Sequence, residues 1–282
     1  MNLALLIVAY EVERDDTPMA KGPLAMLDYG FVQDLRSRGF AVRSRKVQPS
    51  AFSSKEARVA SLTREIAKRV SIAVDNGRLP VILSGGCLAA LGVVTGLRRP
   101  GRRASVLWID AHGDFNTLQS SPSGYWDGMA LGAVCGRSLD EIRELAEAVV
   151  IPGQRVAHIG GRNLDPPEVE AFRRHGVLLL RPKTLARGDA SNLAERLLHQ
   201  VGRSRDLYLH VDVDGIDPFD APAVAFPELA GVRLDDLKRC LADLSPPAAV
   251  TFSATSFAAV GPAKARRTVG ACAELLERAL LG

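Results

Sequence analysis

The sequence predicts an α/β fold in which a single three-layer domain holds a mostly parallel sheet of eight strands, with helices on both faces. Three observations support this prediction. Apolar, β-rich runs alternate with helical patterns from one end of the chain to the other. The runs are short and apolar on both faces, as strands covered by helices on both sides are. The 282 residues, 47% of them hydrophobic, can bury a substantial core, and we expect one domain over residues 1–282.

The first strand is predicted at residues 3–10. Its apolar run has no basic leader and an acidic stretch follows at once, so it is read as a strand and not as a signal peptide. The other strands are expected at residues 41–46, 80–84, 105–110, 155–160, 177–180, 207–212 and 249–253. Helices are expected between them, for example at residues 22–38, 54–76, 190–202, 234–244 and 264–281. The longest region without periodicity runs from Phe115 to about Asp127, and α/β folds bind ligands in such loops.

The composition argues against several classes of protein. The net charge of +4 is small and the basic residues are scattered, which argues against a nucleic-acid partner. No run of eighteen apolar residues predicts a membrane span. The four cysteines have no CxxC spacing, which favours reduced thiols in a cytoplasmic protein. The chain stops at the end of its last predicted helix, which slightly favours a monomer and leaves a homo-oligomer open.

Two clusters of ligand-type side chains come at the ends of apolar strands. Asp110, His112 and Asp114 follow one strand, and Asp212 and Asp214 follow another. Alternate side chains of an extended segment share one face, so each cluster can converge on one point. A single Asp in this position often caps a helix or fixes a turn. Two such clusters, one with an imidazole, instead predict a two-metal hydrolytic site.

Two neighbouring residues are given structural roles. His210 lies deeper in its strand, below the carboxyl edge of the sheet, so we expect a packed, hydrogen-bonded histidine. Asp217 precedes Pro218, which is typical of a turn.

The runs DAHGDFNT, HVDVDGIDP and SGGC resemble the signature motifs of the arginase, agmatinase and formiminoglutamase family, the ureohydrolases. The likeness extends over nearly the whole chain, including KGPLAMLDYG and IGGRNLDPPE. The resemblance implies an arginase-like fold, a bridged Mn²⁺ pair, and hydrolysis of a guanidino-type carbon–nitrogen bond by hydroxide held between the metals. Histone deacetylases share that fold but lack this set of motifs.

The resemblance also implies a role for each ligand. Asp110 and Asp212 would bridge the two metals. Asp114 would complete the first metal's ligands, and His112 and Asp214 the second's.

The loop after Asp114 matches the family's substrate loop without a gap. Asn116, Ser121 and Ser123 fall where arginases contact the substrate's α-carboxylate, and Asp165 and Glu168 fall where they engage its α-amino group. Asp165 is also a typical N-cap of a helix that begins at the following proline, and the two roles are compatible. The resemblance therefore favours a small amino-acid substrate over agmatine, which lacks the carboxylate.

Cys87 stands where the family has a histidine ligand. It can bind a metal as thiolate, or it can be a small apolar residue facing the core. As a ligand it would leave four carboxylates and a thiolate facing two divalent cations, a surplus of one negative charge. That surplus favours a softer metal than Mn²⁺.

Two further departures bear on the substrate. Asp127 takes the place of a proton-relaying histidine, a role that needs a raised pKa. The run from Ala259 to Pro262 lacks the glutamate that pairs with the guanidinium of arginine, and desolvating that cation without a counter-charge is costly. Because N-hydroxylation lowers the basicity of a guanidine, an N-hydroxylated substrate would not need that glutamate.

This combination resembles the branch of the family that hydrolyses Nω-hydroxy-L-arginine to hydroxyurea and L-ornithine in cycloserine biosynthesis. Two alternatives stay open. One is a ureohydrolase acting on L-arginine or another guanidino or formimino acid. The other is a non-catalytic metal-binding relative.

Overall fold

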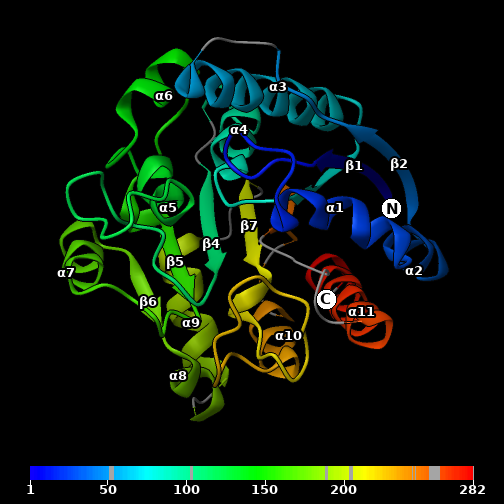
Figure 1. Cartoon of the computed structure of the whole chain (residues 1–282). Helices are drawn as coiled ribbons and strands as arrows, with labels where there is room; N and C mark the ends of the chain where they lie inside the picture. The colour runs from blue at the N-terminus through cyan, green and yellow to red at the C-terminus, as the bar shows by residue number, and fades with distance from the viewer. Residues whose placement is uncertain are drawn as a thin grey trace.

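One parallel sheet runs through the molecule (Figure 1). The computed structural model describes residues 1–50, 54–101, 104–187, 190–202, 206–242, 244, 246–253 and 261–281. The strands pair in the order β2-β1-β3-β8-β7-β4-β5-β6, and every pairing is parallel. Their bounds are β1 (Asn2–Val8), β2 (Ala41–Lys46), β3 (Leu79–Ser84), β4 (Ser105–Ile109), β5 (Val156–Ile159), β6 (Leu178–Leu180), β7 (Leu207–Asp212) and β8 (Ala249–Ser253).

The predicted fold class is confirmed, and each predicted strand is present within two residues at either end. The strands could be located because almost every residue in the central ones is buried on both faces. The sheet is fully parallel, as right-handed crossover connections through helices allow.

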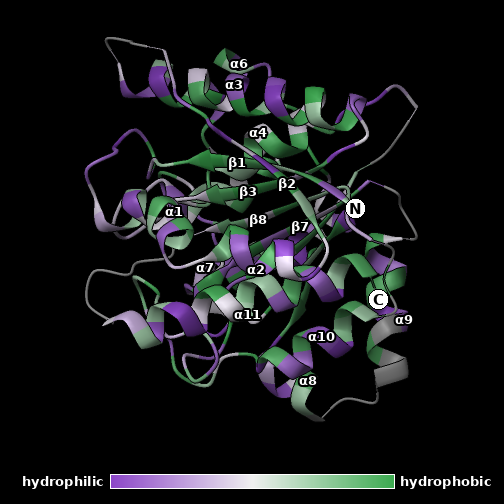
Figure 2. Cartoon of the chain, turned by 90° about the vertical axis from the view of Figure 1, so that its right-hand side faces the viewer, coloured by the Kyte–Doolittle hydropathy of each residue, from purple (hydrophilic) through white to green (hydrophobic). Residues whose placement is uncertain are grey.

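Helices cover the two faces of the sheet (Figure 2). Their bounds are α1 (Pro18–Asp28), α2 (Phe31–Ser37), α3 (Lys55–Asp75), α4 (Ala89–Gly96), α5 (Ala130–Val134), α6 (Asp140–Leu145), α7 (Pro166–His175), α8 (Pro182–Arg187), α9 (Ala190–Val201), α10 (Leu234–Ala242) and α11 (Gly261–Leu281). Figure 2 shows α3 and α4 on one side of the strands and α2, α10 and α11 on the other. None of the described helices is long and apolar enough to cross a membrane.

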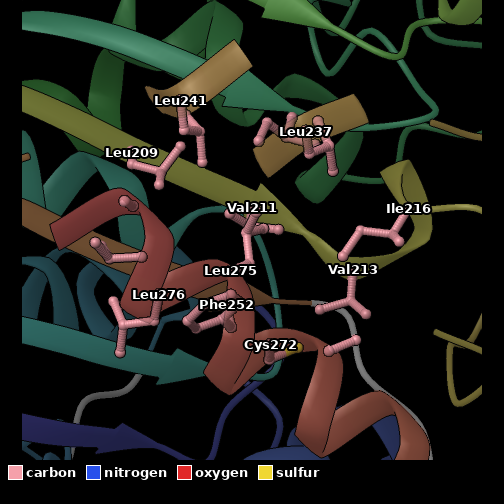
Figure 3. Packing of buried hydrophobic residues seen from close by; sticks show 14 of the residues in the cluster. Leu209, Val211, Val213, Ile216, Leu237, Leu241, Phe252, Cys272, Leu275 and Leu276 are labelled. Atoms are coloured by element: carbon pink, nitrogen blue, oxygen red, sulfur yellow. The ribbon is translucent and has the colours of Figure 1, made fainter. Parts of the chain in front are cut away.

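The alternation of side chains along each strand divides the core into two layers. In β1, Leu3 and Leu5 pack with α2 and α11, whereas Leu6 and Val8 pack with α3 and α4. Figure 3 shows the first layer at β7 and β8, where apolar side chains of these strands meet α10 and α11. The domain therefore has the three layers that its sequence predicts.

The predicted helix over residues 22–38 is two helices, which corrects the prediction. Helix α1 begins earlier, at Pro18, because the Thr17 hydroxyl accepts from Ala20 N at 3.0 Å and caps it. The chain turns at Gly30, whose φ of +99° lies in the left-handed region that ends helices, and α2 then begins. Two short helices, α4 and α5, were not predicted because their sequences are largely apolar and lack a polar face of helical period.

Candidate metal centre and substrate pocket

The carboxyl ends of four central strands meet beside one pocket. Because β3, β8, β7 and β4 are consecutive neighbours in a parallel sheet, the residues that follow them lie together. The pocket holds about 290 Å³ of space for water-sized groups. Its lining includes all but one of the predicted site residues, namely Cys87, His112, Asp114, Asn116, Ser121, Ser123, Asp127, Asp165, Glu168, Asp212 and Asp214. The remaining one, Asp110, is buried against this cluster.

Ligand-type atoms gather in two overlapping groups. In the described part of the chain, one atom each from Cys87, Asp110 and Asp114 lie within 4.8 Å of one another. Single atoms from Asp110, His112 and Asp214 lie equally close. Asp110 belongs to both groups, which is the position that a carboxylate shared between two metals requires.

The cluster is electrostatically unfavourable by itself. Burial, followed by neighbouring carboxylates, raises the pKa of Asp114 and of Asp212 well above the ordinary range. Among the described side chains, Asp114 Oδ2 is a buried atom without a hydrogen-bond partner. Two divalent cations would neutralise these charges and give Asp114 Oδ2 a partner, so the donor set fits the metal pair that the resemblance implies.

Backbone amides and one indole hold the carboxylates in place. Asp110 Oδ2 accepts from Trp108 Nε1 at 2.9 Å, and its Oδ1 accepts from His112 N at 2.7 Å. Asp212 Oδ1 accepts from Asp214 N at 3.0 Å. Such bonds to the oxygens fix the orientation of the carboxylates before any cation binds.

His112 lies among acidic groups. Its Nδ1 is 3.2 Å from Asp214 Oδ2, and its Nε2 is 3.8 Å from Glu228 Oε1. Burial lowers the pKa of His112, but hydrogen bonds with Asp110 and Asp214 outweigh burial and raise it to about 12. A divalent cation would have to displace this proton, since only neutral imidazole binds a metal.

Cys87 faces polar groups. Its sulfur lies 3.1 Å from Asp212 Oδ2 and 3.2 Å from Ser253 Oγ, and the residue is 3% exposed. Burial, followed by Asp212, raises the pKa of the thiol well above its usual value. The side chain therefore contacts the acidic cluster, which favours the ligand role over that of a small core residue.

His210 is packed and hydrogen-bonded, which confirms its prediction. The ring is fully buried and stacks on Trp108 with centroids 3.6 Å apart. Its Nδ1 is 2.8 Å from the Tyr208 hydroxyl, and its Nε2 is 3.2 Å from Ser253 Oγ. Burial lowers the pKa of His210 well below its ordinary value, so the ring is neutral.

The substrate loop forms the mouth of the pocket. Asn116 Nδ2 donates to Asp165 Oδ2 at 2.8 Å, which joins the two sides of the mouth. The hydroxyls of Ser121 and Ser123 are 3.5 Å apart. They accept from Gly124 N at 3.0 Å and Tyr125 N at 3.2 Å, respectively. The residues predicted to contact the two ends of an amino acid therefore lie together.

Glu168 ties helix α7 to this loop. Its Oε1 accepts from Phe115 N and its Oε2 from Asp165 N, both at 2.9 Å. Helix α7 starts at Pro166 with Asp165 as N-cap, as predicted. Glu168 thus has a structural role as well as a place in the pocket lining.

Asp127 lies in the pocket wall. Its Oδ1 accepts from Leu88 N at 2.9 Å and its Oδ2 from the Tyr125 hydroxyl at 3.1 Å. Burial raises the pKa of Asp127 to about 6, although the bond from Leu88 N opposes the shift. A Cβ at residue 86 would stand 2.1 Å from Asp127 Oδ2, so any other residue than glycine would displace this carboxylate. The raised pKa is the property that a proton relay needs.

Several residues at the site were not predicted. The single hydrogen of the Tyr125 hydroxyl is shared between Glu11 Oε1 at 2.5 Å and Asp127 Oδ2 at 3.1 Å. Ser253 contacts the cluster, and Phe226 lines the mouth. Tyr125 could have been suspected because it lies in the same long loop, and Ser253 because it ends a buried strand. The run expected to replace the guanidinium-binding glutamate falls partly outside the described residues, since Ala259 and Val260 are among those not described and Gly261 begins α11.

Solved structures of several hydrolases share the fold. Arginase from Bacillus subtilis aligns over 100% of this chain and 99% of its own, with a TM-score of 0.87 and 23% identity. Proclavaminate amidino hydrolase from Streptomyces clavuligerus aligns over 98% of this chain and 91% of its own, with a TM-score of 0.73 and 17% identity. The predicted arginase-like fold is thereby confirmed.

Comparison of sequences identifies arginases as relatives of this chain. The arginase of Brevibacillus brevis is 28% identical over 242 residues, which are 82% of this chain and 81% of that protein. The arginase of Bacillus caldovelox is 33% identical over 176 residues, 62% of this chain and 59% of that protein. The model of the Arginase family matches residues 14–282, so the chain belongs to the Arginase family.

Proposed function

We propose that the pocket hydrolyses a guanidino-type carbon–nitrogen bond of an amino acid, and that Nω-hydroxy-L-arginine is the substrate, giving hydroxyurea and L-ornithine. One observation carries the proposal. A cluster of side chains of metal-ligand type forms the floor of the same pocket whose mouth holds an amide, two hydroxyls and two carboxylates. A reacting group at the floor and an α-amino-acid group at the mouth match this arrangement.

The floor would hold two divalent cations, Mn²⁺ or a softer metal. The ligands we propose are Cys87, Asp110, His112, Asp114, Asp212 and Asp214. A bound metal pair supplies Lewis-acid activation of water and polarisation of the substrate. The protein's contribution is the fixed orientation of the carboxylates, while the cations would displace the proton that Asp110 and Asp214 hold on His112.

The mouth would bind the amino-acid end of the substrate. Asn116 Nδ2 and the hydroxyls of Ser121 and Ser123 are donors suited to an α-carboxylate. Asp165 supplies a carboxylate for the α-ammonium group. Glu168 already accepts two backbone bonds, so it would contribute chiefly by fixing Asp165 and by its charge. Agmatine has no carboxylate and would leave the donors of the mouth unpaired.

Asp127 would carry the proton that the leaving amine needs. With a pKa of about 6 it can hold a proton near neutral pH and release it. Its Oδ2 is fixed by Tyr125, whose hydroxyl is in turn held by Glu11. The Asp127 side chain therefore has one orientation from which to donate.

The choice of hydroxyarginine rests on charge. The family's guanidinium-binding glutamate is replaced in the run that contains Ala259, and a methyl group cannot balance a desolvated cation. The hydroxyl oxygen withdraws electrons from the guanidine, so the hydroxylated substrate can enter uncharged. This substrate needs no fixed counter-charge at that position.

A paired assay tests the proposal. Purified protein loaded with Mn²⁺ is given L-arginine and Nω-hydroxy-L-arginine side by side, and urea, hydroxyurea and ornithine are measured. We expect the larger kcat/KM for hydroxyarginine. Equal or better turnover of arginine would leave a ureohydrolase and refute the hydroxyarginine assignment. Two bound metals without turnover of arginine, hydroxyarginine, agmatine or a formimino acid would point to a non-catalytic metal-binding protein.

A further inference from the structure

A row of buried polar side chains leads away from Cys87 along β7 and β8. Ser253 Oγ is 3.2 Å from the Cys87 sulfur and 3.2 Å from His210 Nε2. On the other side of the ring, His210 Nδ1 is 2.8 Å from the Tyr208 hydroxyl, which donates to Thr251 Oγ1 at 2.8 Å. Four hydrogen bonds thus join five side chains in a line.

The strands themselves place these groups on one face. His210 is paired with Thr251 in the sheet, and Asp212 with Ser253, so all of these side chains point the same way. The other face of the same strands is apolar, as Figure 3 shows for Leu209, Val211 and Phe252. Packing of a hydrophobic layer does not by itself explain why polar side chains occupy this buried face.

Burying these polar side chains costs free energy unless each polar group has a hydrogen-bond partner. Tyr208, His210, Thr251 and Ser253 are all fully buried. Each polar group in such a place costs about 1–3 kcal/mol if left without a partner. The row meets this requirement by ending on the sulfur of Cys87, at the floor of the pocket.

The direction of the bonds matters once Cys87 binds a metal. A coordinated thiolate carries no proton, so it can only accept. Ser253 must then donate to the sulfur, and its oxygen accepts from His210 Nε2. In this structure the Tyr208 hydroxyl donates to Thr251 Oγ1. When Ser253 donates to the sulfur, the Tyr208 hydrogen turns from Thr251 to His210 Nδ1, which is also 2.8 Å away. A neutral imidazole serves both directions, because it has one donor and one acceptor nitrogen.

We propose that Ser253 is a positioning residue that donates a hydrogen bond to the Cys87 sulfur when Cys87 is a metal ligand, with His210 and Tyr208 fixing the direction of that bond. The proposal rests on the metal-ligand role of Cys87 in the proposed function. The bond withdraws electron density from the sulfur and limits how strongly the thiolate donates to its metal. It thereby offsets part of the surplus negative charge that a thiolate brings to a floor already holding four carboxylates.

Co²⁺ in place of the native metal gives a direct readout, because a thiolate–Co²⁺ bond has a charge-transfer band in the near ultraviolet. In the wild-type protein this band is expected, and Cys87→Ser removes it. In Ser253→Ala the sulfur becomes a stronger donor, so the band moves to longer wavelength. The affinity for one of the two metal ions falls about 10- to 100-fold, as is usual when a ligand loses its hydrogen-bond partner.

Two further variants keep the test independent of folding defects. Tyr208→Phe is nearly isosteric and removes only the hydroxyl that holds His210, so a smaller shift in the same direction is expected. Ser253→Thr retains the hydroxyl and should keep the wild-type band. The matched control is Ser105→Ala, which removes a fully buried hydroxyl at the opposite end of the sheet and should leave the band unchanged.

The outcomes separate this inference from the proposed function. A wild-type protein without a thiolate band would refute Cys87 as a ligand, and the inference with it. A band that is present but identical in Ser253→Ala and wild type would overturn the inference alone. Equal shifts in Ser253→Ala and Ser105→Ala would do the same, since they would reflect a general loss of packing.

Discussion

The floor and the mouth of the pocket are built on different principles. The floor takes its side chains from the ends of central strands, buries them, and leaves Asp114 Oδ2 without a partner in the described structure. The mouth takes its side chains from one loop and the start of α7, and Asn116 and Asp165 already bond to each other. The floor therefore needs cations to pair its buried oxygens, whereas side chains of the mouth are already held to each other by a hydrogen bond before substrate binds. This difference suggests that the floor sets the class of reaction and the mouth selects the substrate.

The largest effect is expected at Asp110, which belongs to both ligand groups of the floor. Asp110→Asn should lose both metals and lower activity by several orders of magnitude. Metal content by mass spectrometry and product release check this. Asp217→Asn is the matched control, because the Asp217 carboxylate accepts from Phe219 N at 2.9 Å in a turn outside the pocket lining. Full metal content in Asp110→Asn would contradict the two-metal floor.

Cys87 comes next. Cys87→Ala should lose one metal and most activity, while Cys87→His should retain both metals, because a neutral imidazole removes the surplus charge. We do not expect Cys87→His to become a good arginase without the missing glutamate. Cys135→Ala, which changes a buried cysteine outside the pocket lining, is the control for metal content. If Cys87→Ala kept two metals, the thiol would be a core residue after all.

Asp127, in the pocket wall, should make the stability of the folded protein depend on pH. Its pKa is raised from 3.8 to about 6, so the folded protein holds this proton more tightly than the unfolded chain does. The resulting stability is fully present below about pH 4 and is lost as the pH rises through about 6. It amounts to at most about 3 kcal/mol. Denaturant unfolding of the metal-free protein between pH 4 and 7 should show this decline, and Asp127→Asn should lack it. Parallel curves for the two proteins would contradict the shift.

The smallest effects are expected at the mouth. Asp165→Asn should raise KM about 10- to 100-fold and change kcat little, since a hydrogen bond to a charged group contributes about 1.5–3 kcal/mol. Ser123→Ala, on the same rim, should raise KM only a few-fold. Steady-state kinetics with hydroxyarginine measure both. A fall in kcat with an unchanged KM would mean that the mouth acts in the reaction itself, and the contrast with the floor would fail.

The sequence predicts features that are set by residues close together in the chain. Asp110, His112 and Asp114 could be grouped because they alternate along a short segment after a strand whose residues are all buried. Helix α4 could not be predicted, because Ala89–Gly96 is apolar all round and has no helical period. The break at Gly30 was missed because a single glycine is compatible with a continuous helical pattern.

The order of the strands in the sheet could not be predicted from the sequence. Cys87 and Ser253 are neighbours only because β3, β8 and β7 are adjacent, and no local pattern states that order. The same holds for Glu11, which contacts Tyr125 although 114 residues separate them in the chain. The sequence therefore identifies the ligands of the floor better than the groups that hold them.

The indole of Trp108 provides an optical probe of the floor. Its N–H donates to Asp110, the carboxylate common to both ligand groups, and the ring is fully buried. The other tryptophan, Trp126, lies in the substrate loop under Lys55. Cation loading should change Trp108 emission directly, whereas substrate should act first on Trp126. The protein thus carries one tryptophan beside the floor and one in the substrate loop, and replacing either by Phe lets metal and substrate titrations be followed separately without an added dye.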